Sequence, residues 1–237
     1  MTVVAAPGFP ADVLKALREG LSRKAVLTHA GLDLPSDGDW FLFWSDRTLS
    51  RSPHLPAAFV AHMSDGEQLK TIVRPEVAVD GSWLILTSEP RMFRSDSFPE
   101  DVFSARAAHA SSPLRLFEMV ADDGEGDLSD APSIALYADG HAVVSNEDGR
   151  EMRDAVSAAA ADGGGIVDVI VAPGGAWMII GNRAVTMSKK SDPGLRQKVQ
   201  DLQARGATVC QAVDGRKGRW ALIVQETTGA PCPGRDG

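Results

Sequence analysis

Five short apolar segments recur at nearly constant spacing, and this repeat constrains the fold more than any other feature of the chain. The segments begin at Trp40, Trp83, Ile134, Trp177 and Trp220, which lie 43, 51, 43 and 43 residues apart. Four of the five tryptophans open such a segment. A fixed period of about 20–50 residues is typical of repeat architectures, in which each unit buries its apolar face against a neighbour. The sequence therefore predicts five similar units.

The single longer interval has a visible cause. It contains the acidic, glycine-rich stretch Asp122–Asp130, which has no counterpart in the other intervals. A calcium loop is the alternative interpretation, but twelve residues counted from Asp122 or Asp123 end at Ser133 or Ile134, where an EF-hand has Glu. We therefore predict a solvated loop insertion without a metal.

Each unit has the same predicted order of elements. The apolar opening segment suits a buried strand, a polar turn follows it, and a second strand comes next. A helix then begins at or near a proline, whose missing N–H costs nothing in the first helical turn, and a third strand ends the unit. In the fourth unit these elements are Trp177–Gly181, Ala184–Met187, Pro193–Arg205 and Thr208–Val213.

The two ends of the chain supply complementary parts of a fifth unit. Thr2–Ala5, Pro10–Arg23 and Ala25–Leu32 suit a second strand, a helix and a third strand, whereas Trp220–Val224 suits a first strand. Pairing of the terminal strands would protect two sheet edges. The predicted fold class is α/β, with α+β repeats forming a closed five-unit α/β propeller of strand-strand-helix-strand units. The first strands would lie nearest the axis, residues 1–229 would form one domain, and residues 230–237 a flexible tail.

Units of this order and length resemble the α/β-propeller, or pentein, fold shared by guanidine-modifying enzymes and by translation initiation factor 6. The tryptophan-anchored repeats also resemble segments of uncharacterised bacterial proteins. In the guanidine-modifying enzymes, the resemblance implies a nucleophilic cysteine in a strand near the C-terminus, with a histidine and acidic residues at the central cavity. Here the last strand has Trp220 and Ala221 instead of that cysteine. The resemblance therefore points to the non-catalytic branch.

The two cysteines form neither a disulfide framework nor a CxxC metal pair. Cys210 lies in an apolar strand, where a buried structural thiol is favoured over an activated nucleophile. Cys232 lies in the Pro/Gly-rich tail, where a thiol without a chemical role is favoured and a reactive thiol is the alternative. The five histidines show neither HExxH nor i,i+4 spacing, so no metal site and no cofactor are predicted.

Charge and hydropathy narrow the range of partners. The formal net charge of −8 and the lack of long Lys/Arg clusters disfavour nucleic acid. The start has no basic segment followed by a long apolar one, and about 18 consecutive apolar residues occur nowhere. We expect a cytoplasmic protein without membrane contact, monomeric or weakly homodimeric.

Polar residues recur at the turns between the first and second strands. Each turn places an acid or amide beside a base, and the candidate binding residues are Asp46, Arg47, Glu89, Arg91, Asp139, His141, Asn182 and Arg183. Ordinary turn chemistry, which favours Asp and Asn, is the competing explanation. His141 and the insertion 122–130 differ most between units, so they are the favoured contacts.

No catalytic motif is present, because the sequence contains no nucleophile elbow, phosphate-binding loop or dinucleotide fingerprint. We predict a non-catalytic binding or scaffolding protein that presents a polar ring or axial cavity to a protein partner or a small polar ligand. The alternative is a cysteine-dependent guanidine-modifying hydrolase or amidinotransferase of the pentein type.

Overall fold

The computed structural model describes most of the chain as strands and helices in regular succession. The described residues are 1–34, 38–78, 81–88, 92–97, 114–119, 133–137, 142–144, 150–161, 165–172, 175–182, 184–215 and 218–226. The described helices are α1 (Ala11–Ser22), α2 (Ala57–His62), α3 (Gly66–Leu69), α5 (Arg150–Ala161) and α6 (Pro193–Ala204).

The strands form five three-stranded antiparallel sheets. Four of them follow chain order: β2 (Leu27–Leu32), β3 (Trp40–Trp44) and β4 (Leu49–Arg51); β5 (Ile72–Val77), β6 (Trp83–Thr87) and β7 (Met92–Arg94); β8 (Leu114–Met119), β9 (Ser133–Tyr137) and β10 (Ala142–Val144); β11 (Ile166–Ala172), β12 (Ala176–Gly181) and β13 (Val185–Met187). The fifth joins β14 (Thr208–Asp214) and β15 (Trp220–Gln225) to β1 (Thr2–Ala5), with Thr2 opposite Val224.

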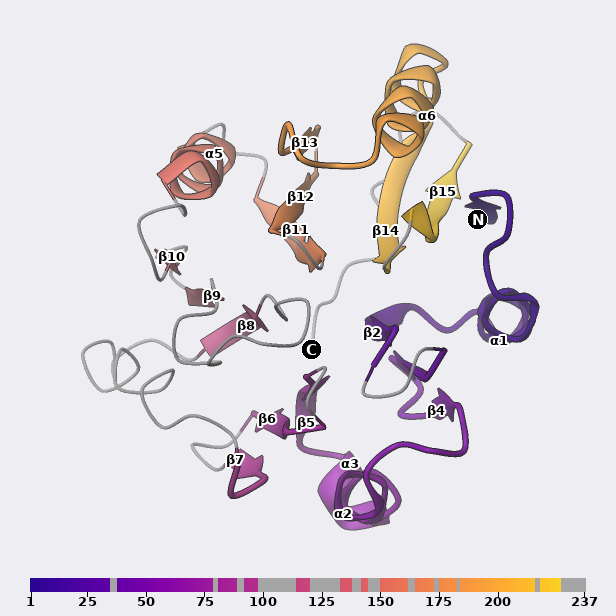
Figure 1. The fold of residues 1–237 in the computed structure, drawn as a ribbon, viewed down its shortest axis with the longest axis vertical. Helices are drawn as coiled ribbons and strands as arrows, with labels where there is room; N and C mark the ends of the chain where they lie inside the picture. Colours follow the sequence, from indigo (N-terminus) through magenta and orange to yellow (C-terminus); the bar gives the residue numbers. More distant parts are fainter. Residues whose placement is uncertain are drawn as a thin grey trace.

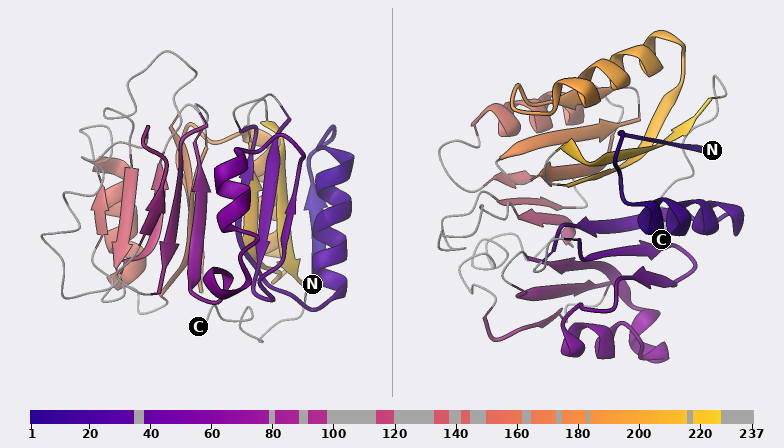
Figure 2. Two further views of the ribbon diagram at one scale, coloured as in Figure 1. Left: turned by 90° about the horizontal axis from the view of Figure 1, so that it is seen from below. Right: turned by 45° about the vertical axis from the view of Figure 1, so that its right-hand side comes forward.

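The five sheets stand around a common centre (Figures 1 and 2). The strands nearest the centre are β2, β5, β8, β11 and β14, and each of them contacts the next, with β14 contacting β2. We call these the inner strands. The middle strands β3, β6, β9, β12 and β15 have a partner on both edges. Because their two faces pack against neighbouring sheets, their sequences are almost wholly apolar, and all five residues of β3 are buried.

Helices fill the outer part of the space between neighbouring sheets, as Figure 1 shows for α1, α2, α5 and α6. On α6, Leu195, Val199 and Leu202 are buried against Ile180 of β12 and Leu222 of β15. These spacings of four and three residues place the three side chains on one face of the helix. The hydrophobic core is thus divided into clusters that lie between successive sheets.

The predicted fold class is corrected by this arrangement. The structure contains five small, separate antiparallel sheets, whereas we expected a closed five-unit α/β propeller of strand-strand-helix-strand units. The expected unit is divided between two sheets, because β3 and β4 precede α2 in one sheet and β5 follows it in the next. The position of the first strands was also wrong, since the tryptophan-bearing strands occupy the middle of each sheet.

Hydrogen bonds to the tryptophans give a physical reason for the repeat. The backbone N–H groups of Trp40, Trp83 and Trp177 donate to the hydroxyls of serines 11 or 12 residues later, at 3.0–3.1 Å. The indole N–H of Trp40 donates to Asp12 at 2.8 Å, and that of Trp220 donates to Asp192 at 3.3 Å. Both aspartates lie 28 residues before their tryptophan, at the start of a helix. The tryptophan therefore ties a middle strand to the preceding helix.

Gly20 allows α1 to approach β3 closely. A Cβ atom at this position of α1 would lie 2.2 Å from Cη2 of Trp44, which is fully buried. Alanine normally stabilises a helix by about 1 kcal/mol relative to glycine, but overpacking a core costs roughly 1–3 kcal/mol. We expect Gly20→Ala to destabilise the protein in urea unfolding. Gly66→Ala in α3, where a Cβ meets nothing within 4 Å, is the control, and equal midpoints for both variants would contradict the packing argument.

Within the described ranges, no helix combines the length and the apolar character that crossing a membrane requires.

Candidate functional site

Each inner strand contains an irregularity in its pairing near its beginning. The register against the middle strand shifts by one residue just before His29, Arg74, Leu116, Asp168 and Gln211. Such bulges redirect side chains and are common beside functional sites. At four of these five equivalent positions the residue is polar, although the strands are otherwise largely apolar.

Four ionisable side chains from three inner strands meet at the centre, and we call them the central cluster: His29, Arg74, Glu76 and Asp168. His29 Nε2 lies 2.9 Å from Glu76 Oε2, Arg74 Nη1 lies 3.4 Å from Asp168 Oδ1, and Arg74 Nε lies 4.0 Å from Glu76 Oε2. The sheets that carry Arg74 and Asp168 are not neighbours in the order around the centre. Their ion pair therefore crosses the centre.

The central cluster is shielded from water. The side chains of His29, Arg74 and Asp168 are no more than 5% exposed, and that of Glu76 is 13% exposed. Burial raises the pKa of Glu76 to about 8. The nearby Arg74 guanidinium lowers this pKa by a smaller amount than burial raises it, and the Asp168 carboxylate raises it further. At neutral pH Glu76 therefore holds a proton, and Arg74 and Asp168 form the ion pair. Perturbed ionisable groups of this kind cluster at functional sites.

The described members of the predicted turn residues, Asp46, Arg47 and Asn182, follow the middle strands β3 and β12 and are not part of the central cluster. Asp46 accepts hydrogen bonds from Thr48 and Arg23, and although burial opposes them, these bonds hold its pKa below the ordinary value. Arg47 has a left-handed backbone (φ 66°), and its guanidinium donates to the carbonyl of Ile72 on β5. Asp46 and Arg47 therefore link the turn after β3 to neighbouring segments of the chain.

The remaining turn residues are less fully described. The backbone N–H of Asn182 donates to the carbonyl of Gly165 at 3.2 Å. Glu89, Arg91, Asp139, His141 and Arg183 lie outside the described residues, as do the insertion 122–130 and the tail 230–237. The binding role of the turn residues therefore stays a prediction.

A second group of charges lies at the opposite end of the sheets, where β14 turns into β15. Burial raises the pKa of Asp214 to about 7; the N–H of Gly215 lowers it, and the carboxylates of Asp192 and Asp33 raise it. Asp33 is paired with Arg219, and Asp192 caps α6 by accepting from the N–H of Leu195 at 2.8 Å. These contacts hold the turn against the neighbouring elements.

The cysteine prediction is partly resolved. Cys210 is buried on β14, but it is disulfide-bonded and not a free thiol as we expected; Cys232 lies outside the described residues. His54 contacts Asp39 at 3.4 Å, and His62 stacks on Phe93. The described part of the chain contains no group of three His, Cys, Asp or Glu side chains that could hold a metal ion.

The sequence contains a signal for the central cluster, and this signal lies in the inner strands and not in the turns. An aliphatic residue, a bulge residue and a polar residue recur at the start of four inner strands, as Leu27–His29, Ile72–Arg74, Ile166–Asp168 and Val209–Gln211. Aligning the third strands of the units would have revealed this recurrence.

Comparison of the chain with protein-family models, curated proteins and solved structures finds no match.

Proposed function

We propose that this protein is a non-catalytic binding protein and that its central cluster recognises a small polar ligand. The carrying observation is the meeting of His29, Arg74, Glu76 and Asp168 from three separate sheets. Burying charges costs more free energy than apolar packing of the same space, so buried ionic groups call for a reason beyond stability. A set that contains both acids and bases can bind a ligand that carries both kinds of group.

The proposal assigns no covalent step to the protein. The nucleophile required by the alternative function, a guanidine-modifying hydrolase or amidinotransferase, is a thiolate, and Cys210 is disulfide-bonded. The disulfide favours an oxidising compartment over the cytoplasmic location expected from the sequence. Ammonia release from a guanidine substrate by the reduced protein, lost in Cys210→Ser, would favour the alternative.

The test is ligand-induced thermal stabilisation with a panel of small amino acids, hydroxy acids, amines and sugars. A ligand at one hundred times its Kd stabilises the folded state by about 2.7 kcal/mol. We expect at least one compound to raise the Tm of the wild type and to lose most of that effect in Asp168→Asn.

Asp46→Asn is the matched control, because Asp46 is an aspartate paired with Arg23, which is not part of the central cluster. Equal stabilisation of wild type and Asp168→Asn by every active compound would place the binding site elsewhere. A panel without any active compound would instead favour a protein partner.

A further inference from the structure

The outer edge of β1 is unpaired within the described part of the chain. β1 lies at the end of its sheet, and β15 is the only described strand that pairs with it. The N–H of Ala6 donates to the carbonyl of Trp220 at 2.9 Å, so Ala6 and every second residue before it face β15. The N–H and C=O groups of an antiparallel strand point to alternate edges, so those of Val3 and Ala5 point away from β15. Each of these two residues thus presents one donor and one acceptor.

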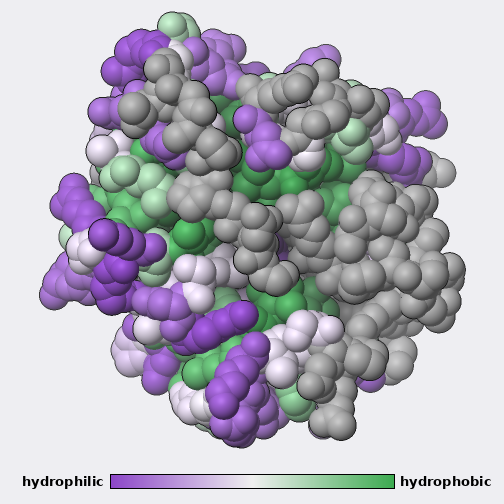
Figure 3. Space-filling view, turned by 180° about the vertical axis from the view of Figure 1, so that it is seen from behind, coloured by the Kyte–Doolittle hydropathy of each residue, from purple (hydrophilic) through white to green (hydrophobic). Residues whose placement is uncertain are grey.

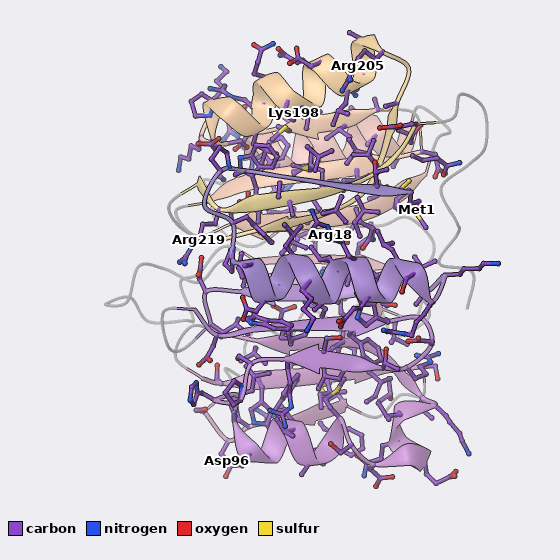
Figure 4. The ribbon with its side chains drawn as sticks, turned by 90° about the vertical axis from the view of Figure 1, so that its right-hand side faces the viewer. Met1, Arg18, Asp96, Lys198, Arg205 and Arg219 are labelled. Atoms are coloured by element: carbon purple, nitrogen blue, oxygen red, sulfur yellow. The ribbon has the colours of Figure 1, made fainter. Side chains whose placement is uncertain are left out.

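The two faces of β1 pack against different helices. Val3 and Ala5 pack against the core cluster to which α1 contributes, and Val4 packs against the cluster to which α6 contributes. Figure 4 shows β1 between α6 and α1, and Figure 3 shows hydrophobic residues at the left edge between the hydrophilic surfaces of these helices. The four residues of β1 include no charge and no proline, which are the usual protections of an exposed edge. The outer edge of β1 is therefore open to another strand.

Basic side chains stand on both sides of this edge. Figure 4 labels Arg18 on α1, and Lys198 and Arg205 on α6, on the face of the molecule that carries β1. Lys198 and Arg205 are about two helical turns apart, so they share one side of α6. Within the described ranges none of the three forms an ion pair, although Arg205 donates to the carbonyl of Asp201. Residues 189–205 carry five Lys or Arg and two Asp, an excess of positive charge in a chain whose net charge is −8.

We propose that the outer edge of β1 binds an extended acidic peptide of a partner protein, which adds to the sheet as a further strand. The outward N–H and C=O groups of Val3 and Ala5 form main-chain hydrogen bonds with the peptide, and its carboxylates meet the cations of α1 and α6. A basic peptide would bring like charges together, and a nucleic acid has no peptide backbone to pair with β1. This surface goes beyond the proposed function, because it uses none of the central-cluster side chains.

The experiment measures the fluorescence anisotropy of a labelled seven-residue peptide in which glutamate alternates with valine. The wild type should bind this peptide roughly tenfold more tightly than the same peptide with lysine in place of glutamate. Val3→Pro should weaken binding roughly tenfold, because proline removes the outward N–H of residue 3 and leaves the bonds of the neighbouring residues to β15 in place. Val3→Ala, which keeps that N–H, is the matched control and should bind like the wild type.

Charge variants test the second part of the proposal, and they keep it testable if Val3→Pro fails to fold. Arg18 and Arg205 are exposed, and the double variant Arg18→Glu/Arg205→Glu should weaken binding of the glutamate peptide roughly tenfold. Lys70→Glu, at an exposed lysine of α3, should bind like the wild type. Asp168→Asn should also retain peptide binding, although it tests the central cluster.

Three results would overturn the proposal. The first is equal binding of the glutamate peptide to Val3→Pro and Val3→Ala. The second is binding of the lysine peptide as tightly as the glutamate peptide, or of neither peptide. The third is equally tight binding of a labelled single-stranded oligothymidylate, which would make this face a general site for polyanions.

Discussion

Replacing Arg74 with methionine is expected to destabilise the protein by roughly 3–5 kcal/mol, the cost of removing one partner from a buried ion pair. Arg74 is 3% exposed and is the cation that faces Asp168 across the centre. Methionine keeps much of the side-chain volume but leaves the Asp168 carboxylate, itself 4% exposed, without this charge. Urea unfolding at pH 7 measures the loss.

The control is Arg23→Met. Arg23 also pairs with an aspartate, Asp46, at 3.0 Å, but its side chain is 40% exposed, and exposed ion pairs contribute only about 0–1 kcal/mol. The double variant Arg74→Met/Asp168→Leu should regain much of the stability, because both charges are gone. Similar losses in Arg74→Met and Arg23→Met would show that water reaches the central cluster.

Glu76→Gln is expected to change how stability depends on pH. The folded-state pKa of Glu76, about 8, lies above the ordinary value of 4.5, so the folded state holds a proton that the unfolded state releases. The stabilisation that this proton contributes to the folded state is fully present below pH 4.5 and is lost as the pH rises through 8. One pKa unit corresponds to about 1.4 kcal/mol, so this loss is at most ~5 kcal/mol.

The measurement is the free energy of unfolding of wild type and Glu76→Gln at pH 5, 7 and 9. The difference between the two proteins should move in favour of the variant as the pH rises, because glutamine has no proton to release. Glu67→Gln, an exposed position in α3, should leave the wild-type profile unchanged. A constant difference between wild type and Glu76→Gln from pH 5 to 9 would mean that Glu76 is ionised throughout.

Individual strands and helices could be predicted from the sequence, because short apolar segments and the position of proline determine where they form. The apolar segment at Trp220 is strand β15, and the helix predicted from Pro193 begins there. The grouping into sheets could not be predicted, because a strand that follows a helix can pair forwards or backwards along the chain. The residue pairs between the two strands, from Ile72 with Thr87 to Val77 with Trp83, show that β5 belongs with β6 and not with β3.

The candidate site was harder to predict, because it depends on contacts between distant strands. Arg74 and Asp168 are 94 residues apart, and a bulge before each residue determines where its side chain lies. Turn residues such as Asp46 and Arg47 attracted attention because their polarity is obvious in the sequence. A polar residue in an apolar strand, such as His29, was the stronger indication of unusual chemistry, since burying it requires a partner.

The pairing of β1 with β15 affects how the protein is made. Val224, the partner of Thr2, is synthesised 222 residues after it. Ribosomes add about 5–20 residues per second, so β1 waits more than ten seconds for the strand that it pairs with. During this time its edge is open to wrong partners, including β1 of another nascent chain. Translation speed and chaperone access should therefore affect the yield of native protein.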